Sequence, residues 1–294
     1  MIRFGIACTG YKGRIFLERM LEATPSAKLG TLFCYRASGQ EASESDAIVA
    51  TAQRLKIPLV EKRRLERCDL AGFDVVFFVG WQYLLVNPPE SAVVFHDALL
   101  PRYRGFAPTV TALLNGDTEI GVSALAPAEE VDSGDLLGQT RVALTYPIKI
   151  ADALRKQAEA TASLALRLLT EWPDIPREPQ DHDCATYSIW RSGEDGQIDW
   201  GASAESICRF IDAVGWPYPG AYTRLNGETI TVTDATPLPD LRFEIRQPGK
   251  VWRFDENKPV VVCGEGLLRI DAARNAAGAP IRVKQLRTRL GAGG

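Results

Sequence analysis

The sequence has few histidines and no clustered cysteines. Among its 294 residues, 2 are histidine and 6 are cysteine. The cysteines form no CxxC pair and show no His-rich spacing, which argues against a zinc site and against a disulfide framework. We therefore expect no metal centre, and the histidines become the first candidates for chemistry.

Long apolar runs and an excess of one charge are also missing. No segment approaches the roughly 20 apolar residues that a membrane-spanning helix needs, and the opening MIRFGIACTG is too short in apolar length for a signal peptide. We expect a cytoplasmic protein without a membrane partner. The formal net charge is only −3, so no global basic field would attract nucleic acid.

The chain lacks the glycine pattern of dinucleotide-binding proteins. The first glycines are Gly5, Gly10 and Gly13, whereas GxGxxG would need a glycine at Cys8. This argues against NAD or FAD binding and against a dehydrogenase. Lys12 and Arg14 flank Gly13, where the N-terminus of a helix could meet an anionic group.

Short apolar runs alternate with helical patterns over the first 172 residues. This alternation predicts a mostly parallel α/β sheet with helices on both faces. Strands are expected at 2–8, 27–35, 57–60, 73–80, 91–95 and 120–126, and helices after Gly13 and at 43–55, 108–116 and 150–172. We assign residues 1–172 to one domain.

The rest of the chain has a different character. Residues 173–202 begin with three prolines within seven positions and are predicted to be a linker. Residues 203–294 contain short strands separated by glycines, and Asn226–Gly227 is the pair that a type I′ hairpin turn favours. This pattern predicts a small C-terminal domain resembling a β-barrel of the OB type.

The stretch VVFHDALLPRYRGFAP, residues 93–108, carries the strongest candidate for chemistry. His96 ends a short apolar run, and ligands of open α/β sheets bind at the carboxyl ends of strands. A carboxylate from the later turn PAEEVDSGDLLGQ would orient the imidazole and stabilise its charged form. On position alone, a purely structural hydrogen bond of His96 is an equal alternative.

The loop WQYLLVNPPE after the strand at 73–80 is unusually apolar. Its residues Trp81, Tyr83, Leu84 and Leu85 either pack on the fold or form the wall of a pocket for a flat ligand.

Taken together, HDALLPRYRG, VDSGDLL, PYPGAY at 217–222 and the strand-rich tail resemble the formyltetrahydrofolate-dependent formyltransferases. The resemblance covers nearly the whole chain in the same order. It implies a Rossmann-like catalytic domain with a C-terminal barrel-like domain, as in methionyl-tRNA formyltransferase and the N-formyltransferases of nucleotide-linked amino sugars. It also implies 10-formyltetrahydrofolate as co-substrate, with His96 and Asp132 as catalytic residues.

The same resemblance implies two sets of binding residues. The folate would contact Gly80, Trp81, Tyr83, Leu84, Leu85, Leu100, Glu129, Glu130 and Val131. The acceptor would contact Tyr11, Lys12, Arg14, Tyr103 and Arg104.

One departure from the family concerns the position two residues before the histidine. The family has an asparagine there, and this chain has Val94. Valine cannot donate a hydrogen bond to the formyl oxygen, and loss of one such donor can cost roughly 10²- to 10³-fold in turnover. Asp97 replaces the small residue that usually follows the histidine.

The expected acceptor is the primary amine of a nucleotide-linked amino sugar, which would place the protein in polysaccharide biosynthesis. A tRNA-formylating member should carry a basic insertion after the second strand, where this chain has the acidic, serine-rich ASGQEASESD. Three alternatives stay open: a methionyl-tRNA formyltransferase, a formyltetrahydrofolate hydrolase, and a folate-binding protein that has lost catalysis at Val94. A homodimer is also open.

Overall fold

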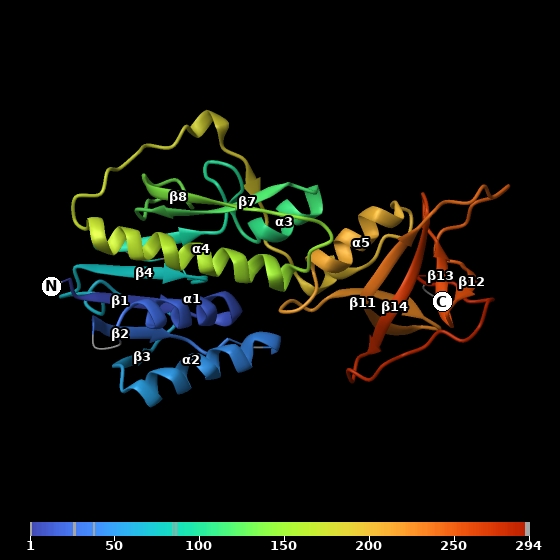
Figure 1. The fold of residues 1–294 in the computed structure, drawn as a ribbon, viewed down its shortest axis with the longest axis horizontal. Helices are drawn as coiled ribbons and strands as arrows, with labels where there is room; N and C mark the ends of the chain where they lie inside the picture. The colour runs from blue at the N-terminus through green and yellow to red at the C-terminus, as the bar shows by residue number, and fades with distance from the viewer. Residues whose placement is uncertain (1, 26–27, 38, 84, 86, 292–294) are drawn as a thin grey trace. The chain divides into compact units, whose positions relative to one another are not determined.

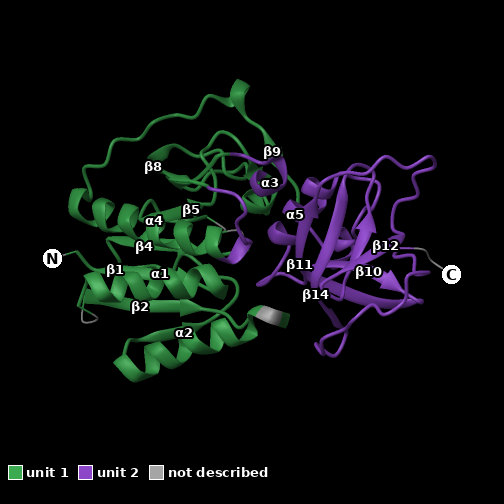
Figure 2. Cartoon of the chain, turned by 45° about the vertical axis from the view of Figure 1, so that its right-hand side comes forward, with its two compact units in different colours: residues 1–111, 118–144, 152–190 green, residues 112–117, 145–151, 191–294 purple. Residues whose placement is uncertain are grey.

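The computed structural model describes residues 2–25, 28–37, 39–83, 85 and 87–291, and it divides into two compact units (Figure 2). The first unit contains residues 1–111, 118–144 and 152–190, and the second contains 112–117, 145–151 and 191–294. The division falls at residue 190, within the segment predicted as a linker. Residues 173–190 therefore belong to the first unit.

The first unit is built on a seven-stranded sheet (Figure 1). Its strands, in spatial order, are β3 (Leu59–Glu61), β2 (Leu29–Cys34), β1 (Phe4–Cys8), β4 (Val75–Val79), β5 (Ala92–His96), β7 (Glu119–Leu125) and β8 (Leu136–Ala143). The first five strands are parallel to one another, and β7 runs antiparallel to both of its neighbours, β5 and β8. The predicted mostly parallel sheet is confirmed. Every residue of β1 and β4 is buried, as expected for central parallel strands.

Three helices of this unit pack against one face of the sheet. Side chains of α1 (Gly10–Ala23), α2 (Ala42–Leu55) and α4 (Ile150–Glu171) belong to one apolar core on the same face. The apolar core on the other face of the sheet includes Leu65 and Leu70 from the segment between β3 and β4. The connection from β4 to β5 contains Pro88 and Pro89, which disfavour a helix there.

Several short elements complete the first unit. They are α3 (Pro108–Asn115), which continues into the second unit, the 3₁₀ turns Gly39–Glu41 and His182–Cys184, and the two-stranded pair of β6 (Arg104–Gly105) and β9 (Tyr187–Ser188). The strand β8 was missed because it lies at the sheet edge and most of its side chains are only partly buried, so it lacks a continuous apolar run.

The second unit contains α5 (Ala204–Ala213), the 3₁₀ turn Gly193–Gly196 and a five-stranded antiparallel sheet. The order of strands is β10 (Ala221–Leu225), β11 (Glu228–Leu238), β14 (Leu267–Asn275), β13 (Lys258–Val262) and β12 (Val251–Asp255). The predicted hairpin is confirmed, with φ of 52° at Asn226 and 83° at Gly227. No ladder joins β10 to β12 directly within 191–291. Residues 288–291 lie along both outer strands, because Val251 donates its N–H to Thr288 and Gly291 donates its N–H to Arg224.

No helix within the described ranges has the length and apolar character to cross a membrane. Among the same residues, no group of three or more His, Cys, Asp or Glu side chains is arranged to hold a metal ion.

Candidate active site

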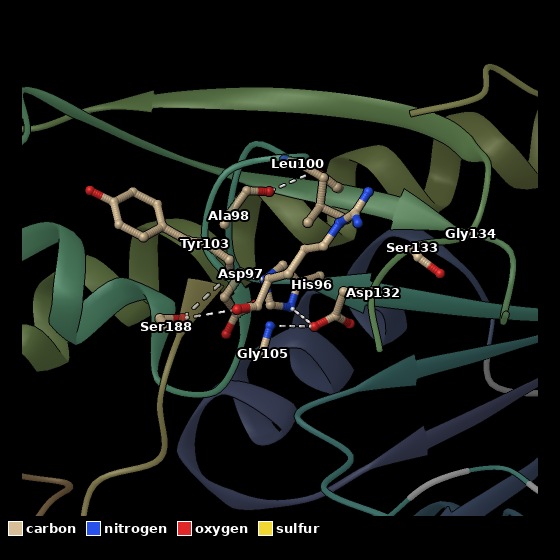
Figure 3. Close-up of polar contacts among 12 residues, drawn as sticks. His96, Asp97, Ala98, Leu100, Tyr103, Gly105, Asp132, Ser133, Gly134 and Ser188 are labelled. Carbon is tan, nitrogen blue, oxygen red and sulfur yellow. Dashed lines mark hydrogen bonds and ion pairs between the residues drawn. The ribbon is translucent and has the colours of Figure 1, made fainter. Parts of the chain in front are cut away.

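His96 ends β5 at the edge of the sheet where the parallel strands have their carboxyl ends (Figure 3). Its side chain is buried, with 7% of its surface exposed. The ring nitrogen Nε2 lies 2.7 Å from the main-chain carbonyl oxygen of Tyr103, and Nδ1 lies 3.4 Å from Oδ2 of Asp132. The two residues predicted to be catalytic are therefore brought together across 36 positions of sequence.

Asp132 lies in the turn between β7 and β8 and has a left-handed backbone, with φ of 54°. Its Oδ2 also accepts a hydrogen bond of 2.8 Å from the backbone N–H of Gly105. Gly105 has φ of 100°, and a Cβ there would lie 2.5 Å from the carbonyl oxygen of Ser188. Only glycine fits this position without a shift of the backbone, so the RYRG turn and the carboxylate turn depend on each other.

The electrostatic environment of His96 contains opposing influences. Burial lowers its pKa, because an imidazolium loses hydration inside the protein. The Asp132 carboxylate and the Tyr103 carbonyl raise the pKa, and the charge of Lys12 lowers it further. The net direction is downward, which favours the neutral imidazole near pH 7.

The protonation pattern of the neutral ring follows from its neighbours. A carbonyl oxygen can only accept, so the N–H of a neutral His96 lies on Nε2 and is donated to Tyr103. The lone pair then lies on Nδ1, which faces the carboxylate of Asp132. A proton that arrives at Nδ1 is stabilised by that negative charge, so the pair is arranged to take up one proton.

Tyr103 and Arg104, which were predicted to contact the acceptor, support the site through contacts within the chain. Tyr103 has φ of 60°, and its backbone N–H donates to Oγ1 of Thr186. Arg104 is only 2% exposed and donates from Nε and Nη2 to Oε1 of Gln180, at 3.2 and 2.7 Å. Arg104 is therefore a buried cation held by Gln180, and its contact with the acceptor stays a prediction.

Gln180 is a functional candidate that sequence reasoning missed. It is 5% exposed, and its Nε2 donates to the main-chain oxygens of Asp132 and Gly134, at 2.8 and 2.7 Å. Its amide thus joins the carboxylate turn to Arg104 of the RYRG turn. The proline-rich composition around it indicated only a linker, and no local pattern signals contacts over nearly 50 positions.

The predicted folate loop forms an aromatic wall. Trp81 packs edge-on against Tyr35 and Phe78, with ring centroids 5.0 and 6.0 Å apart, and Tyr83 packs edge-on against Tyr35. The buried Nε1 of Trp81 has no hydrogen-bond partner within the described residues. A pterin is flat and carries carbonyl and ring-nitrogen acceptors, so an aromatic wall with a spare N–H donor fits that group.

The other predicted folate residues have varied environments. Gly80 has φ of 65°, Leu85 is partly buried, Leu100 is buried, and Glu129, Glu130 and Val131 are exposed. Leu84 lies outside the described residues. Leu85 and Val94 are both partly buried and pack against the same apolar core.

The N-terminal residues predicted to contact the acceptor have partners within the chain. The N–H of Tyr11 donates to Glu41, and Arg14 pairs with Glu18 and Glu44. Lys12 is buried and forms an ion pair with Asp97. Burial lowers the pKa of Lys12 to about 7, while the adjacent carboxylate acts in the opposite direction because it stabilises the ammonium.

Two family models match the chain. The model described as formyl transferase matches residues 42–168, and the model described as formyl transferase, C-terminal domain, matches residues 191–290. Together they cover most of the sequence and both structural units.

Known structures share the fold at low sequence identity. HypX from Aquifex aeolicus in complex with tetrahydrofolic acid is 17% identical with a TM-score of 0.63, and the match covers 96% of this chain and 46% of HypX. An N-formyltransferase from Helicobacter canadensis, in complex with folinic acid and dTDP-3-aminofucose, is 14% identical with a TM-score of 0.67, covering 92% and 99%. Methionyl-tRNA formyltransferase from Clostridium thermocellum is 14% identical with a TM-score of 0.60, covering 96% and 100%. The chain thus spans about half the length of HypX and nearly the full length of the other two.

Proposed function

The chain belongs to the formyltransferase family, and on that premise we propose that it transfers the formyl group of 10-formyltetrahydrofolate to the primary amine of a nucleotide-linked amino sugar. The observation that carries this proposal is the contact between His96 and Asp132 at the carboxyl end of β5. The aromatic wall around Trp81, next to the same strand end, supports a folate as the donor.

The chemistry needs a group that takes a proton from the attacking amine. The amine nitrogen forms a bond to the formyl carbon, the bond from that carbon to N10 of the folate breaks, and the proton lost by the amine ends on N10. Nδ1 of His96 accepts this proton and later returns it. Asp132 stabilises the imidazolium in between, and Tyr103 keeps the ring in one orientation through Nε2.

The acceptor is assigned from the charges near the amino end of α2. Arg14 pairs with Glu18 and Glu44, and Arg36 pairs with Asp46 and Glu61, so both cations are neutralised within the chain. Binding of a tRNA backbone relies on Lys and Arg side chains that replace counter-ions on phosphates. A small nucleotide-linked sugar does not need an extended basic surface. The Helicobacter canadensis structure, which holds dTDP-3-aminofucose, supports the same choice.

The test is incubation of the purified protein with 10-formyltetrahydrofolate and a panel of nucleotide-linked amino sugars, with methionyl-tRNA as a separate acceptor. Mass spectrometry should find one added formyl group on an amino sugar, and His96→Asn should abolish the gain. His182→Gln, which changes the only other histidine, is the matched control. His182 accepts from Nη2 of Arg104 at 3.2 Å, and glutamine keeps an acceptor there, so this variant should retain transfer. Formylation of methionyl-tRNA alone, formate release without an amine, or folate binding without transfer would each contradict the proposal and identify the rival function.

A further inference from the structure

Lys12 is a buried cation beside the site with unused donors. It lies in the first turn of α1 and is 6% exposed. An ammonium has three N–H donors. Among the residues that the structure describes, the partner of Lys12 is the carboxylate of Asp97. A buried ammonium with one partner is costly unless another acceptor arrives, which indicates that a ligand oxygen completes this environment.

The pair lies next to the reacting groups. Asp97 directly follows His96, and Lys12 follows the end of β1, two strands away across β4 in the same parallel sheet. The carboxyl ends of these strands meet at one edge. Lys12 is near enough to His96 to influence the titration of its ring. Asp97 is 23% exposed, so the pair reaches the surface of the site.

Val94 cannot donate a hydrogen bond to the formyl oxygen, and the Lys12 ammonium could supply that hydrogen bond. During attack on a formyl group, negative charge develops on the formyl oxygen. The family resemblance implies an asparagine as the donor to this oxygen, at the position that Val94 occupies in this chain. Val94 instead packs among Trp81, Leu85 and other apolar residues. His96 gives its Nε2 hydrogen to Tyr103, and Asp132 presents a carboxylate, so neither supplies a free donor.

We propose that Lys12, held by Asp97, donates the hydrogen bond that stabilises the negative charge on the formyl oxygen in place of the missing asparagine. This inference rests on the proposed formyl transfer and assigns one more catalytic residue to it. In the resting enzyme the Asp97 carboxylate offsets only part of the cost of burying the ammonium. As negative charge grows on the substrate oxygen, the ammonium interacts more strongly, so the stabilisation is greatest in the transition state.

The decisive variant is Lys12→Met combined with Asp97→Asn, because it removes the donor without leaving a buried carboxylate unpaired. We expect kcat to fall about 10²- to 10³-fold, with KM for donor and acceptor nearly unchanged. Adding Val94→Asn to this double variant should restore part of kcat, because it supplies an amide donor at the family position. Arg19→Met, on the same helix but exposed and paired with Glu22 and Glu159, is the control and should keep kcat.

The outcomes separate this inference from the proposed function. If the wild-type protein transfers formyl groups and the double variant retains its kcat, Lys12 is a structural cation and the inference is overturned. A loss of kcat that Val94→Asn partly restores supports it, and a loss that Val94→Asn leaves unchanged in a protein with wild-type melting temperature overturns it. If wild-type protein transfers nothing to any acceptor, the proposed function itself fails.

Discussion

Gln180 donates a hydrogen bond of 2.8 Å from its side-chain amide to the main-chain carbonyl oxygen of Asp132. The same side chain accepts from Arg104, whose neighbour Gly105 donates its N–H to the Asp132 carboxylate. Gln180 therefore connects the two turns that hold His96 between Tyr103 and Asp132. Residues near it extend this connection, since Glu178 and Leu136 exchange two backbone hydrogen bonds of 2.9 and 2.8 Å.

Replacing Gln180 with methionine should reduce catalysis by altering the position of Asp132. The variant loses four hydrogen bonds and leaves the buried Arg104 without its main acceptor, so we expect the free energy of unfolding to fall by about 1–3 kcal/mol. We also expect kcat to fall more than about tenfold while KM changes little, since small displacements of catalytic groups are costly. Urea unfolding and steady-state kinetics measure both. Gln180→Glu keeps the acceptor for Arg104 but not the donors to the turn. Unchanged kcat in this variant would contradict a positioning role.

The pKa of His96 should lie below the ordinary histidine value of 6.5, because burial disfavours its charged form. Asp132→Asn removes a charge that raises this pKa and should lower it further. Lys12→Met removes a charge that lowers the pKa of His96, so this variant should have a higher His96 pKa.

The pH dependence of the rate follows from this pKa. The neutral base is present above the pKa, so wild-type kcat/KM should persist into mildly acidic buffer. The acid limb of the profile should move to higher pH in Lys12→Met. NMR titration measures the ring directly, with His182→Gln to assign the two histidines. A wild-type value above 6.5 would refute the prediction.

The parallel sheet was predictable from local signals, and the resemblance carried by two continuous stretches led to the pairing of His96 with Asp132. His96 follows an apolar strand, and the HDALLPRYRG and VDSGDLL stretches are continuous in sequence. The environments of Arg104 and Lys12 were not predictable, since each depends on a partner about 80 positions away, Gln180 and Asp97. A charged residue in a turn is usually solvated, so the sequence pointed to an exposed side chain, with a substrate contact as the alternative. Only the fold shows that these side chains turn inward.

Gly134 should not tolerate a side chain. A Cβ at this position would lie 1.8 Å from the carbonyl oxygen of Ala126, so Gly134→Ala must displace the turn that carries Asp132. We expect a strong loss of kcat and a lower melting temperature, since forced backbone shifts typically cost about 1–3 kcal/mol. Gly193→Ala is the matched control, because a Cβ there meets no atom within 4 Å. Equal activity and stability of the two variants would show that the turn can move without affecting the reaction.

The aromatic wall should contribute to folate binding through the indole N–H of Trp81. Trp81→Phe keeps a ring that can pack against Tyr35 and Phe78 but removes the unpaired Nε1 donor. If a pterin oxygen or nitrogen accepts from this donor, its loss should weaken binding by about 1 kcal/mol, or roughly fivefold in Kd. Calorimetry with 5-formyltetrahydrofolate, which cannot donate its formyl group in this reaction, measures the effect without turnover. Trp252→Phe, in the second unit and half exposed, should leave Kd unchanged. Identical Kd values for Trp81→Phe and the wild-type protein would show that the folate does not use this donor, whereas a larger loss in Trp81→Ala would still identify the ring as its stacking surface.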